Sequence, residues 1–171
     1  MATGDEGGAM TYAIEEIGDD AAIGAKLLAL NNEHAAETSL LTAEKFDRMI
    51  AAARVATRIG EDAAFLLGFD RGDAYDGANF AWFRERFESF LYVDRVVVGQ
   101  AWRRLGLGRL LYEDLFRRAQ RQGQAAIACE VNMRPPNPVS DAFHEALGFV
   151  EVGAAVTAGG ARTVRYLLRR R

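Results

Sequence analysis

A run of valines passes directly into a basic, glycine-spaced segment near the middle of the chain. The valines are residues 96–98, and the segment Arg103–Arg109 places two glycines among three arginines. An amphipathic stretch to about Gln122 follows, so the pattern predicts a strand, a turn and a helix. At such a helix start, unpaired backbone N–H groups and the positive end of the helix dipole favour an anion. The sequence therefore predicts a phosphate or pyrophosphate site here.

Length, charge and cysteine content limit the class of protein. With 171 residues, the chain is expected to form one domain over 11–171, after a disordered leader over 1–10. The net charge of −3 argues against a general nucleic-acid binder. The single cysteine, Cys129, excludes an internal disulfide framework or a cysteine-rich zinc site, and it predicts a cytoplasmic protein. Since no apolar run approaches the roughly 20 residues of a spanning helix, we expect no membrane segment.

Hydrophobic periodicity and turn residues outline the remaining elements. Strands are expected over 11–17, 54–59, 63–69, 90–98, 125–132, 149–152 and 163–169, with an exposed loop over 70–79. Helices are expected after Asp19 or Asp20, after Thr42, from the glycine run to about Gln122, and from Asn137 to Leu147. Strands alternating with helices, without repeats or a linker, predict a single α/β domain.

Other interpretations of the glycine run are weaker. A P-loop needs four residues between its glycines and a Lys-Ser or Lys-Thr pair, and both features are missing. A dinucleotide fingerprint needs Gly-x-Gly-x-x-Gly and a later acidic residue, whereas this chain has only one Gly-x-Gly pair. A plain helix start remains an alternative, although two glycines in a first turn cost about 1 kcal/mol each.

Two blocks of sequence resemble the GNAT superfamily of N-acetyltransferases. Arg103-x-x-Gly106-x-Gly108 after the valine strand is similar to the acetyl-CoA signature of that family. The segment from Asn137 to Phe149, with Ser140, Phe143-His144-Glu145 and Leu147-Gly148-Phe149, is similar to the next block. The resemblance covers about 90–153 and is carried by both blocks, in the family's order and separated by a helix and a strand.

The resemblance implies a fold and a cofactor site. The fold would be α/β, of the α+β type, with a mixed, mostly antiparallel sheet of about seven strands and about four helices. The strands 90–98 and 125–132 would splay apart to hold acetyl-CoA, with no metal. The residues implied to bind it are Val96, Val97 and Val98 on the pantetheine arm, Arg103, Arg104, Leu105, Gly106, Leu107, Gly108 and Arg109 at the pyrophosphate, and Asn132, Asn137 and Ser140.

Glu130 is the candidate general base. Attack of an amine on a thioester needs a neutral amine, whose pKa lies near 10 when free, so a base is useful at neutral pH. Glu130 lies on the strand before the second block, where similar members of the family carry an acidic residue. If the sheet and cofactor shield it from water, its pKa would rise toward a useful value. The alternative is a carboxylate at the end of a strand, paired with Arg134.

His144 is the candidate general acid for the departing sulfur. The family usually carries a tyrosine at this position, so the chain departs from the pattern here. Helical spacing places His144 with Asn137 and Ser140 on a polar, cofactor-facing side, opposite Val139 and Phe143. The alternative is a solvated surface histidine. Cys129 points to the face opposite Glu130 and is expected in the core, and the alternative is a thiol that carries the acetyl group in a two-step transfer.

The resulting hypothesis is an acetyl-CoA-dependent transfer of an acetyl group to a primary amine, by direct attack in a ternary complex. The alternative is a non-catalytic module that binds or senses acyl-CoA. The acceptor would be a small molecule or a protein or peptide amine, with no nucleic acid or membrane involved, and the resemblance allows a homodimer. Residues expected to line an acceptor pocket are His34, Glu37, Thr38, Glu88, Tyr92 and Asp94.

Overall fold

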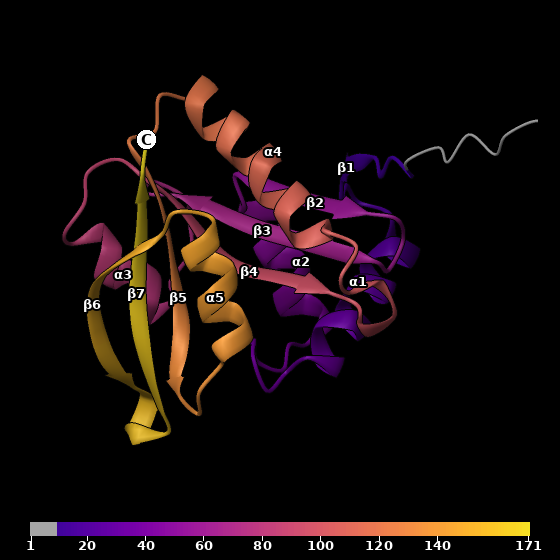
Figure 1. The fold of residues 1–171 in the computed structure, drawn as a ribbon. Coiled ribbons are helices and arrows are strands. Elements are labelled where there is room, and N and C mark those ends of the chain that lie inside the picture. Colours follow the sequence, from indigo (N-terminus) through magenta and orange to yellow (C-terminus); the bar gives the residue numbers. More distant parts are fainter. Residues whose placement is uncertain (1–9) are drawn as a thin grey trace, which may run out of the picture.

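One seven-stranded sheet organises the residues that the structure describes, 10–171 (Figure 1). The structure is a computed structural model, and the predicted leader lies outside these residues except for Met10. The strands are β1 (Ile14–Glu16), β2 (Val55–Ile59), β3 (Ala64–Asp70), β4 (Leu91–Val98), β5 (Ala126–Arg134), β6 (Val150–Thr157) and β7 (Arg162–Arg170). Their order is β1-β2-β3-β4-β5-β7-β6, and only the β4–β5 pair is parallel. The predicted mixed, mostly antiparallel sheet is confirmed.

Five α-helices flank this sheet within the described part of the chain. They are α1 (Ala21–Glu33), α2 (Ala43–Ala52), α3 (Ala78–Arg84), α4 (Leu107–Arg121) and α5 (Pro138–Ala146). As predicted, the side chains of Asp20, Thr42 and Asn137 accept backbone N–H groups at the starts of α1, α2 and α5. Helix α3, which begins after Gly77 with no side-chain cap, was not predicted from the sequence.

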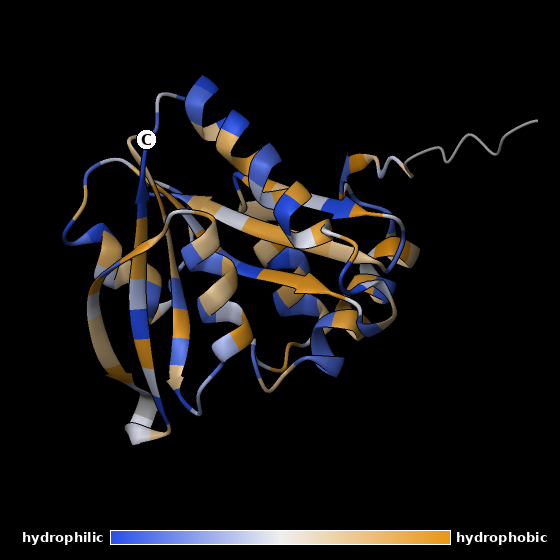
Figure 2. Ribbon diagram, viewed as in Figure 1, coloured by the Kyte–Doolittle hydropathy of each residue, from blue (hydrophilic) through white to orange (hydrophobic). Residues whose placement is uncertain are grey.

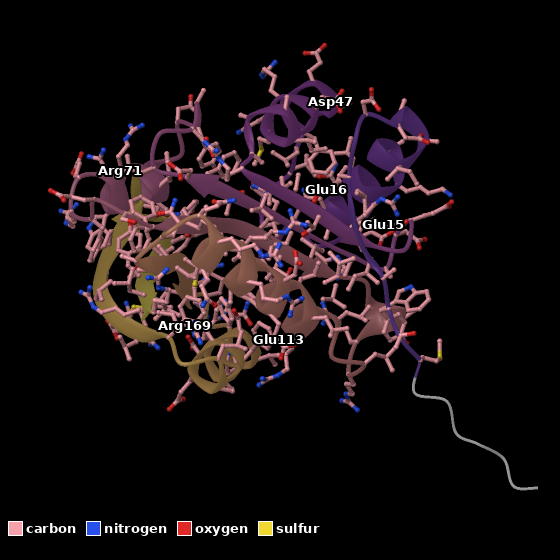
Figure 3. All side chains as sticks on the ribbon, turned by 90° about the horizontal axis from the view of Figure 1, so that it is seen from above. Glu15, Glu16, Asp47, Arg71, Glu113 and Arg169 are labelled. Atoms are coloured by element: carbon pink, nitrogen blue, oxygen red, sulfur yellow. The ribbon has the colours of Figure 1, made fainter. Side chains whose placement is uncertain are left out.

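The helices cover the two faces of the sheet as separate layers (Figure 1). One buried cluster joins apolar side chains of α1, α2 and α3 to one face, with Leu27, Phe46 and Phe80 fully or almost fully buried. A second cluster joins α4 to the other face, with Leu111 and Leu115 fully buried. Figure 2 accordingly shows hydrophobic stretches along the central strands and hydrophilic residues interspersed along the helices, and charged side chains such as Asp47 and Arg71 are exposed at the surface in Figure 3. None of the helices in this described region is long and apolar enough to cross a membrane.

The two central strands separate after a short parallel contact. β4 and β5 pair only at Leu91–Ile127 and Tyr92–Ala128. Beyond Tyr92, β4 stays paired with β3, and beyond Ala128, β5 stays paired with β7. The predicted splay is therefore present, and it leaves one edge of β4 without a strand partner along the valine run.

A β-bulge in β4 lies where the separation begins. Leu67 of β3 pairs with Arg95, and the next residue, Gly68, pairs with Val93. Asp94 is therefore an extra residue in β4, and a bulge of this kind re-aims side chains and ends regular pairing. As a result, Asp94 and Arg95 do not alternate between the two faces of the sheet as neighbours in a regular strand would.

Candidate functional site

A cavity of about 290 Å³ occupies the gap between the splayed strands. Its walls come from both halves of the sheet, including the ends of β6 and β7, from α3, α4 and α5, and from the loop after α1. The lining residues include Glu37, Thr38, Asn79, Asp94, Arg95, Val96, Tyr112, Cys129, Glu130, Asn132, Asn137, Ser140, His144 and Arg162. Within residues 10–171, no group of three His, Cys, Asp or Glu side chains is arranged to hold a metal ion.

Glu130 lies in this cavity with its carboxylate held by a tyrosine. The Tyr92 hydroxyl donates a hydrogen bond of 2.6 Å to Glu130 Oε2. Burial and the nearby Asp94 carboxylate raise the pKa of Glu130 to about 8, against the opposing effects of hydrogen bonds from Tyr92 and Asn79 and of the Arg95 charge. Its hydrogen-bond partner is Tyr92 and not Arg134, whose side chain is exposed. A carboxyl group with this pKa can take a proton from an ammonium group near neutral pH.

The bulge residues form a buried charged pair beside Glu130. Arg95 Nε donates to Asp94 Oδ2 at 2.7 Å, and both side chains are 6% exposed. Asp94 also accepts from the Tyr75 hydroxyl, and Arg95 Nη1 donates to Asn31 Oδ1 at 2.8 Å. The α1 residue Asn31 is thereby tied to the wall of the cavity, and each buried charge has a partner, as buried charges require.

His144 is buried and faces the cavity, but it does not lie on a polar helix face as expected. Its side chain belongs to the interior with 4% exposure, whereas Val139, expected on the apolar side of α5, is 79% exposed. His144 Nδ1 lies 2.7 Å from the Ser140 carbonyl oxygen, and Nε2 lies 2.7 Å from the Tyr112 hydroxyl. The alternative of a solvated surface histidine is therefore wrong.

The contacts of His144 define its proton positions. Since a carbonyl oxygen only accepts, Nδ1 carries the proton and donates to Ser140. Burial lowers the pKa of His144 below its usual value, so the ring is neutral near pH 7. Nε2 of a neutral ring protonated at Nδ1 is an acceptor, and it accepts the Tyr112 hydroxyl proton. In this state the imidazole has no proton to donate toward the cavity from Nε2.

The start of α4 keeps the properties expected of an anion site. Gly106 occupies the N-cap position with φ of 78° and offers no side-chain cap, so the first N–H groups of α4 have no capping acceptor. The backbone of Arg104 also has a positive φ, 65°. Arg103 and Arg104 are exposed, and no ion pair involves either of them among the described residues, whereas Arg109 lies 3.9 Å from Glu113. A Cβ at Gly106 would meet nothing within 4 Å, so the backbone there is open to a ligand.

Two residues of the predicted phosphate segment, Leu107 and Gly108, serve packing. Leu107 is 1% exposed in the core under α4, while Leu105 is 49% exposed. A Cβ added at Gly108 would lie 3.3 Å from the Phe143 ring, so this glycine permits close packing of α4 against α5.

The other predicted cofactor residues are distributed around the cavity. Val96 lines it, Val97 is 3% exposed in the core, and Val98 packs against the opposite cluster. Asn132 and Ser140 also line it, and the Asn137 carboxamide oxygen accepts the Ser140 N–H at 3.2 Å as the cap of α5. Only part of the Asn137 side chain is therefore available to a ligand.

The acceptor residues expected from the sequence are brought together only in part. Glu37, Thr38 and Asp94 line the cavity, Tyr92 reaches it through Glu130, and His34 and Glu88 are not among its lining residues. The lining residues that the sequence did not predict include Asn79, Arg95, Tyr112 and Arg162. Of these, only Tyr112 had a sequence signal, its place on the inner face of the amphipathic helix, and that signal predicted core packing alone.

Cys129 also borders the cavity, on the sheet face opposite the cluster of α1 to α3. Its side chain is 2% exposed and belongs to the cluster under α4, as expected from its position on the strand. Burial raises the pKa of the Cys129 thiol well above its ordinary value. A thiolate is therefore strongly disfavoured at this place, which argues against Cys129 as a nucleophile.

Comparison with known proteins gives a family and a fold. The family model described as an acetyltransferase (GNAT) domain matches residues 23–170. Among curated proteins, none matches the chain.

Several solved structures share the architecture at low sequence identity. The NatC complex bound to Gag peptide and CoA contains a chain with a TM-score of 0.72 and 13% identity, with 94% of this chain and 98% of that chain covered. The ribosomal-protein-S18-alanine N-acetyltransferase from Escherichia coli has a TM-score of 0.65 and 18% identity, with 94% of each chain covered. The structure of yncA from Salmonella typhimurium with its cofactor acetyl-CoA has a TM-score of 0.66 and 18% identity, with 94% of each covered.

Proposed function

Because this chain belongs to the GNAT acetyltransferase family, we propose that it transfers an acetyl group from acetyl-CoA to a primary amine by direct attack in a ternary complex. The observation that carries the proposal is the cavity between the splayed strands, with a carboxyl group of raised pKa inside it. The relatives named above support an amine acceptor, since one is an alanine N-acetyltransferase and another is bound to a peptide.

The residues around the start of α4 fit the anionic part of acetyl-CoA. Uncapped N–H groups at the start of α4, the open backbone of Gly106 and the exposed charges of Arg103 and Arg104 suit a pyrophosphate. Val96 lies on the strand edge that β5 leaves unpaired, where unpaired N–H and C=O groups suit the amides of the pantetheine arm. When bound, acetyl-CoA supplies the activated acetyl group.

Glu130 would act as the general base toward the acceptor. Its ionised form takes a proton from the incoming amine, and the Tyr92 hydroxyl steadies the carboxylate at 2.6 Å. Beside Glu130, the Arg95 side chain forms its ion pair with Asp94. Arg95 therefore does not pair with the Glu130 carboxylate, which stays available to accept a proton. The lining of Glu37, Thr38 and Arg162 between the loop after α1 and the β6–β7 hairpin gives this end of the cavity a polar opening for the acceptor.

A panel of amines distinguishes the proposed enzyme from the non-catalytic acyl-CoA-binding module. Thiol release from acetyl-CoA is followed with small amines, free amino acids and short peptides with unmodified N-termini, and the acetylated product is identified by mass. The enzyme requires that at least one acceptor class stimulates thiol release and yields an equal amount of amide. Tight binding of CoA without stimulated release by any acceptor would instead support the module.

A further inference from the structure

We propose that Tyr112, and not His144, gives a proton to the sulfur of the departing thiol, and that His144 is the positioning residue for Tyr112. The inference rests on the proposed acetyl transfer and concerns one half of its chemistry. It begins from a contact between α4 and α5, since Tyr112 and His144 lie 32 residues apart in sequence and their polar atoms are 2.7 Å apart.

The position of Tyr112 suits a donor to the leaving group. It borders the cavity from the side of α4, whereas Glu130 reaches the cavity from β5 with its carboxylate bonded to Tyr92. Glu130 and Cys129 are neighbours in β5, so they point to opposite faces, and Tyr112 packs in the same cluster as Cys129. A proton acceptor and a proton donor are therefore held on different sides of the gap into which the thioester would fit.

The surroundings of Tyr112 fix the position of its hydroxyl. The ring is fully buried and makes edge contacts with Phe143, His144 and Phe149 at centroid distances of 5.6, 5.4 and 5.8 Å. Its hydroxyl proton rests on His144 Nε2, because Nδ1 of that ring donates to Ser140. A hydroxyl proton turns about its C–O bond, and a developing thiolate is a stronger acceptor than a neutral ring nitrogen. The Tyr112 proton can thus move from His144 toward the sulfur as charge forms.

The pKa of Cys129 indicates how stable a sulfur anion is in this part of the cavity. Burial raises the pKa of the Cys129 thiol well above its ordinary value, so a thiolate here gains strongly from protonation. Burial also raises the pKa of Tyr112, which therefore keeps its proton throughout the neutral range. His144, whose pKa is lowered by burial, is a neutral acceptor over the same range.

The transfer forms one carbon–nitrogen bond and breaks one carbon–sulfur bond. The amine nitrogen bonds to the carbonyl carbon and passes a proton to Glu130. The carbon–sulfur bond breaks, its electron pair stays on sulfur, and sulfur takes the Tyr112 hydroxyl proton. After the thiol leaves, Tyr112 regains a proton from solvent and Glu130 releases one to solvent, so that amine and thioester have become amide and thiol.

Kinetics of Tyr112→Phe give the first test. We expect kcat to fall about 100-fold, the scale of lost general acid catalysis, with KM for acetyl-CoA within about two-fold of wild type. Tyr12→Phe is the matched control, because Tyr12 is not among the residues lining the cavity, and it should leave both constants unchanged. His144→Gln, which keeps an acceptor for the Tyr112 hydroxyl, should retain more activity than His144→Phe. Wild-type rates in Tyr112→Phe would overturn the proposal.

Titration of bound CoA tests the same contact without turnover. The thiolate of CoA is followed by ultraviolet difference absorbance between loaded and unloaded protein, so that the signal of Cys129 cancels. A hydrogen bond from Tyr112 stabilises the thiolate, so Tyr112→Phe should raise the pKa of the bound thiol by about one unit. Equal pKa values in wild type and variant would overturn the proposal.

A third measurement uses wild-type protein and remains informative if the variants do not fold. Nitrogen-15 NMR of the imidazoles is simple because the chain has only two histidines. The proposal requires a neutral His144 with its proton on Nδ1, and a proton on Nε2 near pH 7 would contradict it. A wild-type chain that acetylates no amine would remove the proposed function itself. An active wild type with a normal Tyr112→Phe variant would remove only this inference.

Discussion

The Tyr92 hydroxyl donates a 2.6 Å hydrogen bond to Glu130 across the only two-residue stretch where β4 and β5 pair. Tyr92 pairs with Ala128, so Glu130 lies two residues beyond the last contact, where the strands begin to separate. The proposed base is thereby placed at the closed end of the gap, with β4 on one side and β5 on the other. This position accounts for both the raised pKa of Glu130 and its access to a substrate.

The pH dependence of turnover should follow Glu130. Because the base acts in its ionised form and its pKa is raised to about 8, kcat/KM should rise with pH and level off above about 8. Glu130→Gln should lower kcat about 100-fold and remove this rise, while affinity for CoA stays unchanged. Steady-state rates from pH 6 to 9.5 check both statements, and a wild-type plateau beginning below pH 6 would contradict the assignment.

The free energy of unfolding should also depend on the ionisation of Glu130, and it should fall as the pH rises. A carboxyl group whose pKa is higher in the folded than in the unfolded chain costs stability as pH rises from its unfolded value through about 8. Glu130→Gln should therefore match wild type near pH 4.5 and exceed it at pH 9 by about 4–5 kcal/mol, which corresponds to roughly 10 °C or more in Tm. Thermal unfolding at the two pH values measures the difference. A variant less stable than wild type at pH 9 would show that the ionised carboxylate is favourable in the fold.

Arg104→Glu should weaken CoA binding about ten-fold, or about 1.4 kcal/mol, because it reverses a charge beside the uncapped start of α4. Arg48→Glu is the matched control, since it makes the same charge change on the exposed side of α2. Calorimetric titration with CoA at low and high salt compares the variants, and the loss should shrink at high salt. Equal losses in the two variants would show that only overall charge matters.

Substitution of Gly108 should affect packing in proportion to side-chain size. A Cβ would lie 3.3 Å from Phe143, so Gly108→Ala gains about 1 kcal/mol of helix propensity and loses a similar amount to crowding. Gly108→Val adds two more methyl groups and should lose about 2 kcal/mol. Urea unfolding of the two variants tests this order, and equal stabilities would mean that α5 moves freely away from α4.

Asn31→Ala should lower the free energy of unfolding strongly, although Asn31 lies in α1 and does not contact Glu130. It removes the acceptor of Arg95 Nη1 and the donor to the Ser39 carbonyl, leaving buried polar groups without partners. We expect a loss of about 2–3 kcal/mol in the free energy of unfolding. A loss below about 0.5 kcal/mol would indicate that water replaces the Asn31 carboxamide.

The parts of the fold that local sequence determines were predicted well. The caps at Asp20, Thr42 and Asn137 and the turn at Gly106 depend on neighbouring residues, so single-sequence patterns were sufficient. Helix α3 was not predicted because Gly77 offers no side-chain cap. The aromatic residues that follow also give no clear division into a polar and an apolar helix face. The splay of β4 from β5 came only from the resemblance to a known family, since nothing in either strand alone specifies its partner.

The contacts inside the site were less predictable because they join distant residues. The Asp94–Arg95 pair depends on a bulge opposite Leu67 and Gly68, which a regular alternation of faces cannot anticipate. Helical spacing placed His144 toward the cavity, but it also predicted Val139 on the apolar side of α5, whereas Val139 is exposed. Its bond to Tyr112 arises only when α4 and α5 pack together.

A crystal structure of the chain with CoA would locate the cofactor relative to the two separated strands. We expect the pantetheine arm to run along the edge of β4 at Val96, the pyrophosphate to lie at Gly106, and the sulfur to contact the Tyr112 hydroxyl. CoA bound elsewhere, for example in the shallow hollow beside Lys26 and Trp102, with the β4–β5 cavity filled by side chains, would contradict this expectation.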